Sequence, residues 1–278
     1  MIKLGSHVAF SAPGYLSKAI EVSINNGANC AMIYLGAPQN TKRVDVVKYN
    51  YEEYLEKYSN IIKNEDIVVH APYIVNPANP EKQDFAVEFL TAEVLRMHEV
   101  NLKYLVLHPG AFTSFTAEIA LETLSSSLTK ILENTSHTKV EIILETMAGK
   151  GSEIGRTFEQ LLEVIKNLNN ERLGICLDTC HMWDAGYNLK NYDQFMSELE
   201  NKDVLKHVKV IHLNDSKNPL GAQKDRHENI DKGHIGLETL AKFVHDKRFD
   251  NIPIILETPI PESGPIYDQE IKMLLEKK

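Results

Sequence analysis

The chain has 278 residues, of which 43% are hydrophobic and 25% are charged, and it carries a formal net charge of −9. This composition predicts a globular protein with a large core, and the negative charge argues against binding nucleic acid through a broad basic surface. No segment approaches the roughly 18 consecutive apolar residues of a membrane helix, the start lacks the apolar core of a secretory signal, and three cysteines are too few for a disulfide framework.

We therefore expect a cytoplasmic protein with no membrane partner.

Along the chain, short runs rich in Val, Ile and Leu alternate with longer stretches whose apolar residues recur every three or four positions. The runs are typical of strands covered on both faces, as in a parallel sheet, and the longer stretches are typical of amphipathic helices. Strands are predicted at residues 2–8, 30–35, 66–72, 103–109, 140–146, 172–178, 208–214 and 252–258, and helices at 13–27, 84–100, 115–132 and 157–168.

The number of alternations identifies the fold class. Eight strand–helix alternations in one chain of this length favour a (β/α)₈ TIM barrel, in the α/β class, over an open doubly wound sheet. No glycine-rich nucleotide-binding motif follows any predicted strand, which removes the usual signature of an open nucleotide-binding sheet. We predict a single domain spanning residues 1–278.

Titratable side chains recur where the predicted strands end, which in this fold is the end that carries the chemistry. From the third predicted strand to the eighth, the terminal or nearly terminal polar residues are His70, His108, Glu145, Asp178, His212 and Glu257. His181 follows closely after the sixth strand, and the loop after the seventh contributes Asp225 and His227. If the strand ends converge, four carboxylates and five imidazoles share one cavity.

Each of these residues alone has an ordinary explanation, such as a hydrogen-bonded structural histidine or a glutamate at a helix start. Together, four buried carboxylates would repel one another and lose hydration, at a cost of several kcal/mol per ion. Divalent metals remove this cost, and imidazole with carboxylate suits catalytic zinc, with manganese or iron as substitutes. Nine ligands are about right for three ions. The resulting cluster would be locally positive and would attract an anion such as phosphate.

The residues at these positions resemble the endonuclease IV family of abasic-site DNA repair endonucleases over essentially the whole chain. The stretches that carry the resemblance are LGSHV, GAPQNT, VVHAPYIVNPAN, LVLHPGA, ILETMAGKG, LDTCHMWDAGY, HLNDSKNPLGAQKDRHENIDKGHIG and ILETP. Together they are far more specific than any short match alone.

The resemblance implies three zinc ions and a DNA-cleaving hydrolase. His70 and His108 would hold the first ion and Glu145 would bridge it to the second, which Asp178, His212 and Glu257 would complete. His181, Asp225 and His227 would hold the third. The implied reaction is hydrolysis of the phosphodiester 5′ to an abasic site in double-stranded DNA, leaving a 3′-hydroxyl and a 5′-deoxyribose phosphate. Removal of blocked 3′ ends is the related activity, and the family implies a monomer.

Candidate DNA contacts lie in the loops after the predicted strands. The resemblance places Tyr73 and Ile74 where family members wedge side chains into the gap left by the missing base, although both could instead pack within their loop. Gln39 and Asn40 are candidates for a polar finger, and Arg226 for a phosphate contact. Lys217 is a weaker phosphate candidate, and His7 could support the metal ligands without binding an ion. With few basic contacts, we expect a shallow dependence of DNA affinity on salt.

Two other functions remain open. A sugar isomerase or epimerase on the same barrel would use one metal held by Glu145, Asp178, His212 and Glu257, but it does not require the other five ligands. A non-enzymatic DNA-binding or metal-sequestering protein would need a broken ligand set, and none of the ligands is missing.

Overall fold

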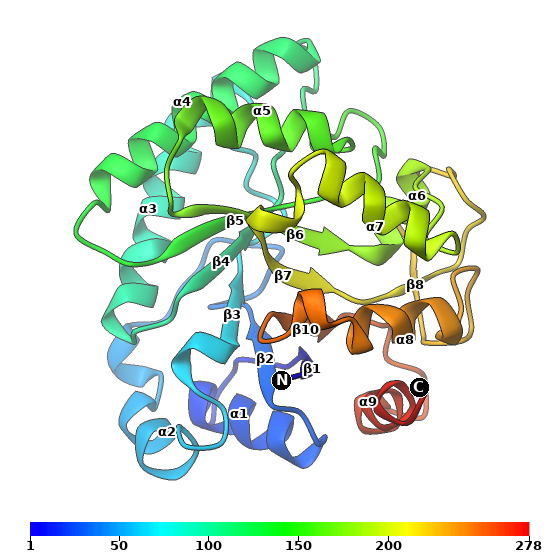
Figure 1. Cartoon of the computed structure of the whole chain (residues 1–278). Helices are drawn as coiled ribbons and strands as arrows, with labels where there is room; N and C mark the ends of the chain where they lie inside the picture. Colours follow the sequence, from blue (N-terminus) through cyan, green and yellow to red (C-terminus); the bar gives the residue numbers. More distant parts are fainter. Residues whose placement is uncertain (278) are drawn as a thin grey trace.

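The computed structural model describes residues 1–277, and its parallel strands form a closed barrel (Figure 1). The barrel strands are β1 (Lys3–His7), β2 (Cys30–Ile33), β3 (Ile67–His70), β4 (Tyr104–Leu107), β5 (Glu141–Glu145), β6 (Leu173–Asp178), β7 (Val208–His212) and β10 (Pro253–Leu256). Each strand pairs with its neighbours in chain order, and β1 closes the barrel against β10 through register partners such as Gly5 and Ile255. The predicted TIM barrel is confirmed.

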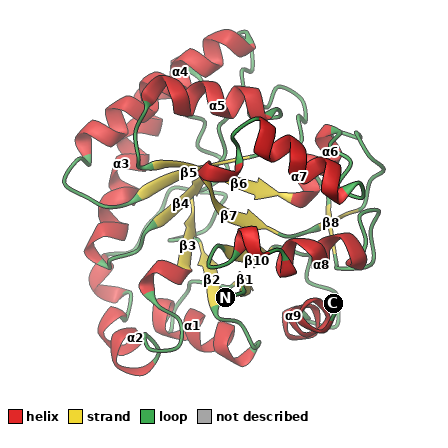
Figure 2. Ribbon diagram, viewed as in Figure 1, coloured by secondary structure: helices red, strands yellow, loops and turns green. Residues whose placement is uncertain are grey.

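Helices surround the barrel, as Figure 2 shows. They are α1 (Tyr15–Asn25), α2 (Tyr51–Lys57), α3 (Gln83–Glu99), α4 (Ala117–Asn134), α5 (Phe158–Leu168), α6 (Thr179–Ala185), α7 (Tyr192–Asn201), α8 (Leu237–His245) and α9 (Tyr267–Glu276). Short 3₁₀ helices occupy Val46–Lys48, Asn64–Asp66, Pro80–Lys82, Leu205–His207 and Lys247–Phe249. The loop after β7 also forms a small antiparallel pair, β8 (Asp215–Ser216) with β9 (His227–Glu228).

The four predicted helices are present within two residues at each end. The predicted strands are also present, but several are too long, and two site residues fall just outside them. His108 follows the end of β4, because Pro109 comes next and has no N–H with which to continue a ladder. Glu257 follows β10, because its N–H donates to the side chain of Asn214 (2.8 Å) rather than to a neighbouring strand.

One buried cluster contains a residue from almost every barrel strand and fills the middle of the barrel. Its members are Cys30, Met32, Val68, Val106, Ile143, Cys176, Val210 and Ile255, all with 0% exposure. A larger apolar layer includes buried residues of both the strands and the surrounding helices. Because the interior is packed, a site on the barrel axis has to lie at one of its two ends. Among residues 1–277, no helix is both long enough and apolar enough to span a bilayer.

Candidate metal centre

The predicted ligands continue the interior face of the barrel. Side chains alternate between the two faces of a strand, so a residue two positions after an interior residue points in the same direction. Six predicted ligands stand two positions after a member of the interior cluster: His70, His108, Glu145, Asp178, His212 and Glu257 follow Val68, Val106, Ile143, Cys176, Val210 and Ile255. The strands therefore aim these six polar side chains at the carboxyl end of the barrel axis.

Glu145 lies at the centre of the first group. Its Oε2 lies 3.1 Å from Nε2 of His70 and 3.1 Å from Nε2 of His108, and its Oε1 lies 3.0 Å from Nδ1 of His212. The carboxylate is 1% exposed. The Nδ1 of His70 contacts the carbonyl oxygen of Ala71 at 2.6 Å, which leaves Nε2 facing Glu145. The two oxygens of Glu145 thus face different sets of imidazoles, an arrangement that suits a carboxylate bridging two ions.

A second group combines three carboxylates with one imidazole. The potential ligand atoms of Glu145, Asp178, His212 and Glu257 all lie within 4.8 Å of one another. Nδ1 of His212 is 2.9 Å from Oε2 of Glu257 and 3.9 Å from Oδ2 of Asp178. This arrangement is compact enough for one ion to contact every member.

The third group forms where β6 passes directly into α6. Asp178 is the N-cap of α6, and its Oδ1 accepts the N–H of His181 at 2.7 Å. The side chain of His181 then reaches the loop between β8 and β9, where its Nε2 lies 3.0 Å from Oδ1 of Asp225. Nε2 of His227 lies 3.6 Å from the same oxygen and 3.7 Å from Oδ2 of Asp178. Cys180, which the sequence did not single out as a ligand, also lies near Asp225 and His227.

The pKa shifts show how these groups balance their charges. Burial alone would raise the pKa of Glu145, but His212 and His108 hold it well below its usual range. Burial raises the pKa of Asp178. Burial would lower the pKa of His181, but Asp178 and Asp225 raise it well above its usual value. The pKa values of His108 and His212 are also raised by neighbouring carboxylates, so positive charge is favoured beside these carboxylates, and bound cations would supply the same compensation.

The donor set fits divalent metal ions. Among residues 1–277, no Lys or Arg nitrogen lies within 4.0 Å of the carboxylates of Glu145, Asp178, Asp225 or Glu257. Among the described residues, Nε2 of His227 is buried without a hydrogen-bond partner, and a buried nitrogen of this kind needs an explanation. A cation bound by this nitrogen together with Asp178 and Asp225 would explain it.

Two supporting residues went unnoticed in the sequence. Asn214 is fully buried, and its Nδ2 donates to Oδ2 of Asp178 at 2.9 Å while its Oδ1 accepts the N–H of Glu257. It stands two positions after His212, so strand periodicity could have indicated it. The carbonyl oxygen of Thr146 contacts Nδ1 of His181 at 2.9 Å, which leaves Nε2 for the third group.

The candidate DNA contacts lie in loops at the same end of the barrel. Tyr73 and Ile74, after β3, are 55% and 43% exposed. Gln39, after β2, is exposed, and Asn40 is half-buried with its Oδ1 accepting the N–H of Lys42 at 2.9 Å. The exposed Arg226 donates from Nη1 to the carbonyl oxygen of its neighbour Asp225 at 2.9 Å. Their roles toward DNA stay predictions.

The remaining two candidates, Lys217 and His7, are exposed and half-buried, respectively. Lys217 is exposed, and its Nζ lies 4.0 Å from a carboxylate oxygen of Glu228. His7 ends β1 and its ring packs edge-on against Tyr34, whose ring lies 4.9 Å from that of His70. His7 is therefore connected to the predicted ligand His70 through the ring of Tyr34, and its supporting role stays a prediction.

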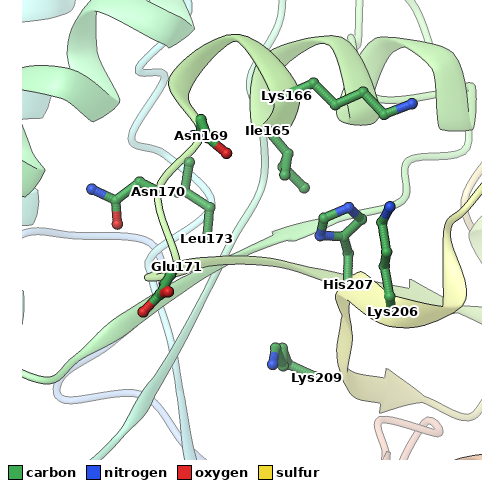
Figure 3. A pocket seen from close by; sticks show the side chains of 9 residues that line it. All are labelled: Ile165, Lys166, Asn169, Asn170, Glu171, Leu173, Lys206, His207 and Lys209. Atoms are coloured by element: carbon green, nitrogen blue, oxygen red, sulfur yellow. The ribbon is translucent and has the colours of Figure 1, made fainter.

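A cavity of about 450 Å³ lies at the opposite end of the barrel. Figure 3 shows Lys166 extending from a helix above it, with Lys206 and His207 side by side. Leu173, which also lines it, is the first residue of β6, whereas the predicted ligand Asp178 is the last. The cavity is therefore separate from the metal centre.

Comparison with known proteins gives a consistent family assignment. A sequence profile described as "Xylose isomerase-like TIM barrel" matches residues 21–277. The chain is 63% identical to "Probable endonuclease 4" of Mycoplasmopsis synoviae (strain 53) and 62% identical to that of Mycoplasmopsis pulmonis (strain UAB CTIP), in each case over 100% of both chains. The crystal structure of endonuclease IV from Thermus thermophilus superimposes with a TM-score of 0.87, covering 99% of this chain and 100% of that one at 24% identity. The chain therefore belongs to the endonuclease IV family.

Proposed function

We propose that this protein is a metal-dependent DNA repair endonuclease that hydrolyses the phosphodiester 5′ to an abasic site. The products would be a 3′-hydroxyl and a 5′-deoxyribose phosphate, and the same site would remove blocking groups from 3′ ends. The observation that carries the proposal is the convergence of nine potential ligands at the carboxyl end of the barrel in a chain about 60% identical to proteins named as probable endonuclease 4.

The nine residues would hold three divalent ions, with zinc as the first choice. His70, His108 and Glu145 would hold one ion. Glu145, Asp178, His212 and Glu257 would hold the next. His181, Asp225 and His227 would hold the third. When bound, such ions activate water and neutralise the charge that develops on a phosphoryl group.

The chain's own residues would organise the reaction around the ions. Glu145 places one carboxylate oxygen toward each of two ligand sets. Nδ2 of Asn214 donates to Oδ2 of Asp178, so this oxygen keeps a fixed direction. No side chain in the group then has to act as the nucleophile, because every member is needed to hold an ion.

Recognition of damage would come from the exposed loops. An abasic nucleotide has no base to unstack, so extruding it costs less than extruding a normal nucleotide. Tyr73 and Ile74 would enter the gap, Gln39 and Asn40 would contact the neighbouring backbone, and Arg226 would bind a phosphate. The monomeric state and the cytoplasmic location stay predictions.

A ketose isomerase or epimerase is the alternative, since the matching profile is named for xylose isomerase. Such an enzyme needs the four ligands of the second group and one ion. It gives no reason for His181, Asp225 and His227 to converge outside that group.

The test uses the zinc-loaded protein and a duplex labelled at its 5′ end that contains one abasic site. We expect a single cut 5′ to the site, with an end that a polymerase extends directly. A matched intact duplex is the control, and a duplex with a phosphoglycolate at a nick tests 3′-end cleaning. Binding without cutting would favour a non-enzymatic protein, and turnover of a ketose with one ion per chain would favour the isomerase; either result overturns the proposal.

A further inference from the structure

We propose that Asp184 is a positioning residue that holds the loop between β8 and β9 in the conformation that presents Asp225 to the third metal site. This inference rests on the metal centre of the proposed function and extends it to a residue outside the ligand set. Asp184 belongs to α6, three positions after His181, so one short helix provides a predicted ligand and the support for another.

Asp184 is fully buried, and its carboxylate accepts hydrogen bonds only from donors in β8 and in the loop that follows it. Its Oδ2 accepts the N–H of Asp225 at 2.8 Å, the N–H of Lys224 at 3.2 Å and Nδ2 of Asn218 at 3.2 Å. Its Oδ1 accepts the hydroxyl of Ser216 at 2.7 Å. Among residues 1–277, no Lys or Arg nitrogen lies within 4.0 Å of this carboxylate, so its contacts serve the loop and not an ion pair.

The loop needs this support, because its backbone is not in a relaxed conformation. Asp225 has φ of 54° and Gln223 has φ of 54°, both in the left-handed region that few non-glycine residues adopt. The strain falls at the residue whose Oδ1 must face His181 and His227. The hydrogen bond from the N–H of Asp225 to Asp184 fixes that residue directly.

Backbone contacts from the same end of α6 strengthen the attachment. The N–H of Gln223 donates to the carbonyl oxygen of Asp184 at 3.0 Å, and the N–H of Gly221 donates to that of Trp183 at 3.0 Å. Nε1 of Trp183 donates to the carbonyl oxygen of Asn218 at 2.9 Å. These bonds dock the loop, and the bond from the N–H of Asp225 to the carboxylate of Asp184 holds the predicted ligand residue itself.

Two substitutions separate hydrogen bonding from simple burial. Asp184→Ala removes both carboxylate acceptors and should weaken binding of the third metal equivalent by about 10- to 100-fold, the usual loss when a residue that supports a ligand is removed. Asp184→Asn can keep an oxygen toward the three N–H donors while its amide donates to Ser216, so it should retain the third equivalent. Asp66→Asn is the matched control, because Asp66 is also a buried carboxylate (4% exposed) but lies before β3 at the opposite end of the barrel.

The measurement is metal content in the absence of DNA. Each protein is loaded with zinc, passed over a chelating resin and counted by mass spectrometry, and a cobalt titration follows the absorption of each equivalent. We expect wild type, Asp184→Asn and Asp66→Asn to agree, and Asp184→Ala to lose one equivalent while keeping the others. A full metal complement in Asp184→Ala overturns the proposal. The loss of one equivalent in Asp184→Asn also overturns it. If the alanine variant does not fold, the metal count of Asp184→Asn decides the question. Failure of wild type to cut abasic DNA would refute the proposed function without changing these counts.

Discussion

The buried ion pair between Arg43 and Glu93 should stabilise both the fold and a candidate DNA loop. Nε of Arg43 lies 2.9 Å and 3.0 Å from the two carboxylate oxygens of Glu93, and the side chains are 2% and 0% exposed. Nη1 of Arg43 also donates to the carbonyl oxygen of Lys42 at 2.8 Å, within the loop that carries Gln39 and Asn40. Arg43→Met keeps the packing volume but leaves the carboxylate without its main partner.

Breaking a buried pair by removing one partner costs about 3–5 kcal/mol. Arg96 places its Nη1 3.5 Å from Glu93 and compensates part of the charge, so we expect the lower end, about 3 kcal/mol. For a domain of this size, that loss corresponds to a decrease in Tm of about 6–12 °C.

The assay is thermal unfolding followed by circular dichroism, with Lys57→Met as the control. Lys57 lies 2.7 Å from Glu53, but the two side chains are 52% and 39% exposed, and exposed pairs contribute about 0–1 kcal/mol. The double variant Arg43→Met, Glu93→Leu should recover much of the loss, because it removes both charges. Equal Tm decreases for Arg43→Met and Lys57→Met would refute the reasoning.

Further predictions concern the metals, the DNA loop and acid stability. Glu145→Gln should reduce incision by at least about 100-fold while abasic duplex still binds in a gel-shift assay, because the bridging charge is lost and the loops are unchanged; full activity would disprove its role as a ligand. Chelation should lower Tm, and zinc at about 100 times its Kd should restore about 2.7 kcal/mol; an unchanged Tm would contradict binding to the folded state. Tyr73→Ala should weaken binding to abasic duplex about 10-fold with no change in Tm, since the ring is 55% exposed; equal losses on intact duplex would argue against a wedge. Burial would raise the pKa of Asp246, but Arg248 lowers it overall, so this group stabilises the protein above the ordinary pKa of Asp, about 4, and its contribution is lost as the pH falls below that value. Asp246→Asn should therefore lower Tm at pH 7 more than at pH 3, and an equal decrease at both pH values would rule this out.

The sequence alone predicted the barrel and the residues that converge at its end. Both depend on local periodicity: eight apolar runs predict strands covered on both faces, and polar residues two positions beyond interior residues must share their direction. The convergence of Glu145 with His70, His108 and His212 follows, because parallel strands in a closed barrel bring their carboxyl ends to one place.

Only the tertiary structure decided the contacts that depend on loop conformation. Asp225 reaches His181 because its backbone adopts a left-handed φ and α6 accepts its N–H, and neither feature has a periodic signal. Arg43 and Glu93 lie 50 positions apart in a loop and a helix, so their pairing could not be read from spacing. Periodicity fixes the direction of a side chain on a strand, whereas the partner of a loop residue depends on long-range packing that no local pattern encodes.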